Sequence, residues 1–123
     1  MTLLLVRAYL LLLSFETAIV RGQFNAVYRH VRDCAVRTSP EPFGPRDAPN
    51  AINTACVLYF KQVECLQRSA ALVCLLRQLG TRAQLVIGAQ QLPFRAHAWV
   101  EVNGVVVNDS PPSVQLYGVL DRL

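Results

Sequence analysis

The spacing of the apolar residues changes once in the middle of the chain, at Gly80, and this change limits the fold more than any other feature. Before Gly80, apolar side chains recur at helical spacing through residues 65–79, and a glycine at this point suits the end of a helix. After it, residues 83–88, 95–102 and 105–108 form β-like runs, and Asn103-Gly104 is a strong hairpin signal. A helix followed by strands in this order predicts an α+β fold.

The first half of the chain is predicted to be helical, with one clear interruption. Residues 3–36 favour one or two helices, and a further helix is expected to begin near Asn50. Between them, residues 38–50 hold four prolines and a glycine, so this segment cannot continue a helix. A chain of 123 residues suffices for one core, so we expect a single domain over residues 1–123, in which residues 1–50 form the helical N-terminal part and the proline-rich loop.

Residues 3–20 are strongly apolar and raise the question of membrane targeting. Arg7 interrupts the run, Glu16 lies near its end, and no small-x-small cleavage site follows, so the segment differs from a secretory signal. A membrane span needs about 20 residues with few charges. We therefore favour an amphipathic or largely buried helix. Contact with a partner protein or with a membrane surface are the alternatives.

The charge of the chain is moderately basic, with 12 Lys and Arg against 8 Asp and Glu and a net charge of +4. The arginines are scattered singly, Lys61 is the only lysine, and no aromatic platform alternates with basic residues. This distribution disfavours nucleic-acid binding. The apolar fraction of 53% disfavours disorder.

The four cysteines, Cys34, Cys56, Cys65 and Cys74, contain no Cys-x-x-Cys pair. On one continuous helix, nine-residue steps from Cys56 would place successive thiols about 180° apart, whereas zinc needs ligands that converge on one point. An even number of cysteines permits disulfides, but the apolar content is large enough to form a core without them. We therefore expect no metal cluster, reduced thiols and a cytoplasmic location.

Three residue types used in nucleophilic catalysis occur in order: Cys65, His97 and Asp109. Together they can supply a thiol nucleophile, its base and the group that orients the base. Cys65 begins a predicted helix, where unpaired N–H groups and the helix dipole stabilise a thiolate. Cys74 lies inside that helix and is expected in the core, and Ser69 lies one turn beyond the helix start. The pattern therefore favours Cys65 as the nucleophile of a small hydrolase or acyl-transfer enzyme.

The position of Asp109 relative to His97 depends on the hairpin register. With a two-residue loop at Asn103-Gly104, Asn108 shares the face of His97 and Asp109 points to the opposite face, so Asn108 would be the orienting residue in place of Asp109. With a three-residue loop and a glycine bulge, His97 lies directly opposite Asp109. We expect the bulged register, because only this register forms the triad.

Four features follow one another between residues 64 and 109: a helix headed by cysteine, an Ile-Gly strand, the segment Pro-Phe-Arg-Ala-His-Ala-Trp-Val-Glu, and an Asn-Asp end. In this combination the chain resembles the transglutaminase-like B proteins, the leader peptidases of lasso peptide biosynthesis. The resemblance implies a transglutaminase and papain-like core, in which the cysteine-bearing helix packs on a small antiparallel sheet. It also implies Cys65 as nucleophile, His97 as base and Asp109 as orienting residue.

The same resemblance implies a cysteine peptidase that uses no cofactor and cuts a ribosomal precursor peptide between its leader and its core. An ATP-dependent cyclase would then join the freed core amine to an acidic side chain. About 60 residues precede Cys65, and they contain no β-rich module, so the chain is expected to be the split form that works with a separate leader-recognition protein. The apolar N-terminal helices are the candidate docking surface for that partner.

Two alternatives stay open at this point. A transglutaminase-like acyltransferase would use the same three residues with an amine in place of water. A non-catalytic peptide-binding module on the same fold would belong to a different functional class, although the presence of all three residue types in order argues against it.

Overall fold

The computed structural model describes residues 2–38, 43–91, 94–109 and 114–123. In these residues it shows an α+β fold, as the sequence predicts, in which the helices precede a four-stranded antiparallel sheet of order β3-β2-β1-β4. The helices are α1 (Thr2–Val20), α2 (Phe24–Asp33), α3 (Asp47–Leu58) and α4 (Cys65–Gln78). The strands are β1 (Ala83–Gln91), β2 (Phe94–Val102), β3 (Val105–Val106) and β4 (Gly118–Arg122).

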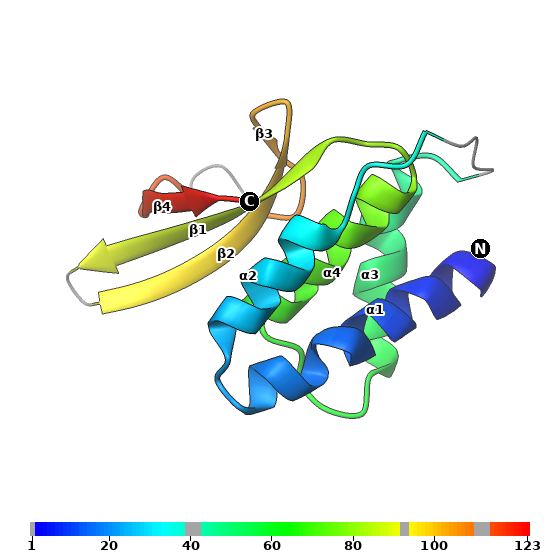
Figure 1. Cartoon of the computed structure of the whole chain (residues 1–123), viewed down its shortest axis with the longest axis horizontal. Helices are drawn as coiled ribbons and strands as arrows, with labels where there is room; N and C mark the ends of the chain where they lie inside the picture. Colours follow the sequence, from blue (N-terminus) through cyan, green and yellow to red (C-terminus); the bar gives the residue numbers. More distant parts are fainter. Residues whose placement is uncertain (1, 39–42, 92–93, 110–113) are drawn as a thin grey trace.

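Helix α4 lies at the centre of the molecule, between the other helices and the sheet (Figure 1). It packs against α1 and α3 as well as against β1 and β2, so residues from Ser69 to Arg77 are all buried. A helix that is covered all round must be apolar on nearly every face, which is the pattern of this segment. The first turn of α4 is less covered, and Cys65 there is half-buried.

Helix α1 covers one side of α4 and α3 with the face formed by Leu4, Ala8, Leu12 and Phe15. This contact confirms that α1 packs against the core, but the helix is neither amphipathic nor largely buried, because its outer surface is apolar as well. The remaining surface of α1 carries exposed apolar side chains: Leu3, Val6, Leu10, Leu13 and Val20. Within the described part of the chain, α1 is the one helix long and apolar enough to cross a membrane, and 28% of its most apolar stretch is buried.

Hydrogen bonds to Glu16 link the C-terminal part of α1 to α4 and to the residues that follow α3. Its carboxylate accepts hydrogen bonds from Tyr59 Oη at 2.7 Å, from Lys61 Nζ at 2.9 Å and from Gln67 Nε2 at 3.1 Å. Burial acts to raise the pKa of Glu16, but these three donors outweigh it and hold the pKa below the usual carboxyl value. Burial and the adjacent carboxylate raise the pKa of Tyr59, so the phenol stays a donor.

Substituting glutamine for Glu16 is expected to remove an acid-sensitive part of the stability. Because the pKa is lowered in the folded state, the carboxylate stabilises the fold above the unfolded-state pKa, and this contribution is lost as pH falls through the folded-state pKa. Urea unfolding of both proteins should show that wild type is more stable at neutral pH, and that the difference shrinks as the pH falls below the unfolded-state pKa of the carboxyl group. A difference that is the same at every pH would contradict the role of the charge.

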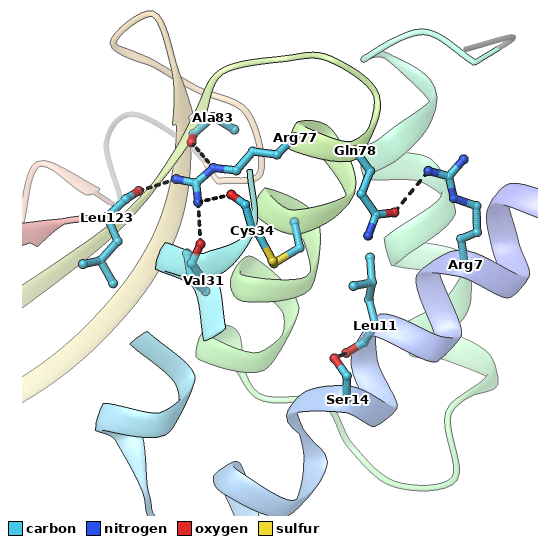
Figure 2. Close-up of a disulfide and its surroundings, with 10 residues drawn as sticks. Arg7, Leu11, Ser14, Val31, Cys34, Arg77, Gln78, Ala83 and Leu123 are labelled. Atoms are coloured by element: carbon cyan, nitrogen blue, oxygen red, sulfur yellow. Dashed lines mark hydrogen bonds between the residues drawn. A yellow bond between two sulfur atoms is a disulfide. The ribbon is translucent and has the colours of Figure 1, made fainter. Parts of the chain in front are cut away.

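The cysteines differ from the sequence expectation, because Cys34 and Cys74 form a disulfide (Figure 2). Cys34 directly follows α2, and Cys74 lies in the buried part of α4. Packing of the two helices brings their Cα atoms to 5.7 Å across a sequence separation of 40 residues. This proximity is tertiary and has no local signal in the sequence. The expectation of four reduced thiols is therefore wrong, and the cytoplasmic location loses that support, while Cys56 and Cys65 are free.

Arg77 joins the helices to the sheet beside this disulfide (Figure 2). Its guanidinium donates to four backbone carbonyls, those of Val31 (2.6 Å), Cys34 (3.2 Å), Ala83 (3.1 Å) and Leu123 (2.8 Å). These carbonyls belong to the end of α2, the start of β1 and the residue that follows β4. Burial lowers the pKa of Arg77, and the carbonyl dipoles compensate the buried cation.

The sequence analysis did not predict β4. Its residues are exposed, and neither alternation nor a turn motif marks the segment. The strand forms because β1 offers a free edge, to which Gly118–Arg122 pairs with an irregularity between Ile87 and Gly88. This pairing brings the segment beside the site described below.

Candidate active site

Cys65 is the first residue of α4, as the sequence predicts. The helix begins there because Glu64 is extended (φ −80°, ψ 161°) and the next residues continue the apolar helical pattern. The Glu64 side chain makes no capping hydrogen bond, so it does not cover the amides of the first turn. Those amides lack intrahelical acceptors and favour an anion at this position.

The hairpin that carries His97 has the two-residue loop and not the expected bulge. Val102 pairs with Val105 across the turn, and Asn103 and Gly104 have φ values of 52° and 77°. Positive φ at both positions is typical of a type I′ turn, whose twist matches that of the strands. Asparagine and glycine adopt this conformation at low cost, which explains why the shorter loop forms.

In this register a regular ladder would turn Asp109 away from His97, but the ladder ends at Val106. The Val107 N–H still donates to the Val100 carbonyl at 3.0 Å. The Val100 N–H, however, donates at 2.8 Å to the side-chain oxygen of Asn108. A side chain thus replaces a backbone acceptor, and the chain leaves the sheet at this point. The departure allows Asp109 to reach His97 without a bulge.

His97 and Asp109 are in direct contact through His97 Nε2 and Asp109 Oδ2. Both side chains are partly covered, with exposed fractions of 23% and 22%. An imidazole held by a carboxylate through Nε2 has Nδ1 as its second nitrogen for proton transfer. The side chain of Asn108 instead bonds to the Val100 N–H and to Ser69 Oγ.

Two cavities meet at Cys65, His97 and Ala98. The first, of about 220 Å³, is mainly apolar and is also lined by Phe24 and Tyr28 of α2. The second, of about 340 Å³, is more polar and contains Arg68, Asn108 and Asp109. The thiol and the imidazole therefore stand between two spaces that could receive the two sides of a bound chain.

The His97 ring packs beside two aromatic rings, those of Trp99 and Tyr117. The ring centroid of His97 lies 5.3 Å from that of Tyr117 and 5.9 Å from that of Trp99. Gly88 pairs with His97 across the strands, and a Cβ atom at this position would lie 2.6 Å from the Trp99 ring. The absence of a side chain at Gly88 is thus what lets the rings pack beside the imidazole. Trp99 is buried and donates from Nε1 to Glu101.

Sequence reasoning missed the contributions of Tyr117, Gly88 and Asn108 to this site. The Ile-Gly strand motif included Gly88 but gave it no role. Asn108 was considered only as an alternative partner of His97, not as a residue that bonds to Val100 and Ser69. Nothing in the local pattern around Tyr117 indicates a position near His97. Their proximity depends on the pairing of β4 with β1.

The family model of the transglutaminase-like superfamily matches residues 2–122, nearly the whole chain. The chain belongs to the transglutaminase-like superfamily. Over 48 residues it is also 48% identical to the microcin J25-processing protein McjB of Escherichia coli, a match that covers 39% of this chain and 23% of McjB. The chain therefore spans less than a quarter of that relative in the matched region. No solved structure matches the chain. The family match and this similarity confirm the resemblance noted from the sequence.

Proposed function

We propose that the chain is a cysteine peptidase whose catalytic residues are Cys65, His97 and Asp109. The observation that carries the proposal is the contact between His97 Nε2 and Asp109 Oδ2. Cys65, at the start of α4, lines the same two cavities as His97. This arrangement gives the imidazole a fixed orientation and leaves Nδ1 to exchange a proton with the thiol.

The reaction follows from the geometry in two stages. Cys65 Sγ attacks the carbonyl carbon of the scissile peptide bond, and its proton passes to His97 Nδ1. The carbon–nitrogen bond then breaks, His97 gives the proton to the leaving amine, and a thioester remains on Cys65. Water attacks the thioester, loses a proton to His97 and releases the acid, after which the proton returns to the thiol. The N–H of Cys65 is positioned at the helix start to stabilise the oxyanion.

The proposed substrate is a ribosomally made lasso precursor peptide, cleaved between leader and core. Support comes from the 48% identity over 48 residues to a microcin-processing protein. The cleaved core would pass to an ATP-dependent cyclase, and a ribosomal substrate and an ATP-using partner fit a cytoplasmic reaction.

The decisive experiment is incubation of the protein with a lasso precursor peptide and a candidate leader-binding protein, followed by mass spectrometry of the peptide. Appearance of free leader and free core supports the peptidase. Transfer of the leader to an added amine, without hydrolysis, would indicate the acyltransferase alternative. A peptide that stays bound and intact would favour the non-catalytic module.

Recognition of the leader is proposed to need a separate partner that docks on α1. The exposed residues Leu3, Val6, Leu10 and Leu13 follow the alternating three- and four-residue spacing by which one helix contacts another element, and Val20 lies seven residues beyond Leu13 on the same face. Leu3 and Leu10 are 62% and 58% exposed, an unusual amount of apolar surface for one helix.

Replacing Leu10 and Leu13 together with glutamate is expected to weaken partner-dependent cleavage about 10-fold or more, because the complex would have to bury two charges. The free protein should keep its melting temperature, since both side chains are already exposed. Val105→Glu, at an exposed apolar position on β3, serves as the control. Equal stimulation of all variants by the partner would rule out α1 as the docking face.

A further inference from the structure

We propose that Ser69 and Asn108 are positioning residues that hold Asp109 against His97. The inference rests on the proposed peptidase function, because it concerns how the same three catalytic groups are held together. Neither residue would contact the scissile bond.

Three hydrogen bonds link the elements that carry the triad. Ser69 Oγ donates to the backbone carbonyl of Ala98 at 3.1 Å. Asn108 Nδ2 donates to Ser69 Oγ at 3.0 Å, and Asn108 Oδ1 accepts from the Val100 N–H at 2.8 Å. Ser69 is 1% exposed and its bond to Ala98 is buried, whereas the two bonds of Asn108 are partly buried. Loss of the Asn108 amide would therefore leave the buried Ser69 hydroxyl without one of its partners.

Three members of this chain of bonds each lie near one catalytic residue in the sequence. Ser69 is one turn after Cys65 in α4, Ala98 follows His97 in β2, and Asn108 precedes Asp109. The backbone ladder between β2 and β3 ends at Val106, before the catalytic carboxylate is reached. Beyond that point the Val107 N–H bond and the Asn108 side chain attach the segment to β2. The placement of Asp109 therefore depends on Asn108.

The direction of each bond is set by chemistry. The Val100 N–H can only donate, so Asn108 must present its carbonyl oxygen there and its amide nitrogen to Ser69. Ser69 has one hydroxyl proton, which goes to the Ala98 carbonyl, and its lone pair accepts the amide proton of Asn108. A carboxylate at position 108 could accept from Val100 but could not donate to Ser69. The same assignment argues against Ser69 as a nucleophile, because Ser69 is buried and its hydroxyl proton is hydrogen-bonded to the Ala98 carbonyl.

The test combines a spectroscopic signature with kinetics, using Asn108→Asp and Ser69→Ala. In wild type the imidazole proton shared with Asp109 should give a downfield proton resonance, assigned by its loss in Asp109→Ala. Both variants are expected to lose or broaden this resonance and to lower kcat about 10- to 100-fold, with KM changed less than about 2-fold. Asn103→Asp, the same change in the exposed turn, should leave the resonance and kcat unchanged.

A double-mutant cycle separates positioning from general loss of stability. If Asn108 acts through Asp109, the kinetic effect of Asn108→Asp should largely vanish in an Asp109→Ala background. An equally large effect in that background, or an unchanged resonance in both variants, would overturn the proposal. Asn108→Asp is nearly isosteric, so it keeps the test decisive even if Ser69→Ala fails to fold.

The resonance also distinguishes this inference from the peptidase proposal. If wild type cleaves no peptide and the variants still lose the resonance, the positioning role stands and the proposed function fails. If wild type cleaves the peptide and the variants keep both the resonance and kcat, the proposed function stands and the positioning role fails.

Discussion

Substituting alanine for Cys65 is expected to abolish cleavage, with a loss in kcat of at least about 10³-fold. The covalent route needs a sulfur at the start of α4, and Ser69, the nearest hydroxyl in the following turn, is buried and hydrogen-bonded to a carbonyl. The measurement is the rate of leader release followed by peptide mass, with the partner protein present and protein folding checked by circular dichroism.

The chain offers a matched control in its other free cysteine, Cys56. Burial raises the pKa of the Cys56 thiol, which keeps it protonated and unreactive at neutral pH. Cys56→Ala should therefore retain full activity. His97→Ala should be nearly as damaging as Cys65→Ala, whereas Asp109→Ala should leave more residual activity, because it removes only the orienting group. Full activity in Cys65→Ala would disprove the proposed mechanism.

Reduction of the Cys34–Cys74 disulfide is expected to lower the free energy of unfolding by about 4 kcal/mol. The estimate comes from the entropy that a cross-link over a separation of 40 residues removes from the unfolded chain. For a chain of this size the melting temperature should fall by roughly 10–20 °C. Thermal unfolding with and without a strong reductant measures the change directly.

The control for this experiment is the double variant Cys34→Ala and Cys74→Ala. It should resemble the reduced protein and should not respond to reductant. Alkylation of the native oxidised protein should modify no thiols other than Cys56 and Cys65, while denaturation with reductant should expose all four. Reductant-independent stability in wild type would show that the cross-link makes no contribution. Because α2 supplies Phe24 and Tyr28 to the apolar cavity, reduction should also loosen that wall.

Local sequence signals predicted most of the secondary structure. The apolar helical pattern and Gly80 marked α4 almost to the residue. The proline-rich segment also marked the break before α3, but α3 begins at Asp47 and includes Pro49, which the sequence had placed in the loop. Proline is tolerated in the first turn of a helix, because the N–H that it lacks would have no intrahelical acceptor there. These signals are strong because they reflect backbone preferences that act within a few residues. The strand β4 was missed because its exposed residues pair only with an edge that folding creates.

The hairpin shows where a local rule is insufficient. Asn103-Gly104 correctly indicated a tight turn, but the sequence analysis chose the register by assuming that a regular ladder must bring Asp109 to His97. The structure keeps the two-residue turn and ends the ladder early, with the Asn108 side chain taking over a backbone hydrogen bond. A side chain that replaces a backbone acceptor depends on its surroundings, here on Ser69 in α4.

By itself, the sequence determined the order of the helices and strands as far as β3, the α+β class, and the residue types of the candidate triad, because each of these follows from residue type and short-range pattern. Only the tertiary structure decided the Cys34–Cys74 pair, the aromatic rings beside His97 and the Ser69–Asn108 link. Those features join residues distant in the chain, and they exist only after the packing of α4 against the sheet and α2 has set the distances between them.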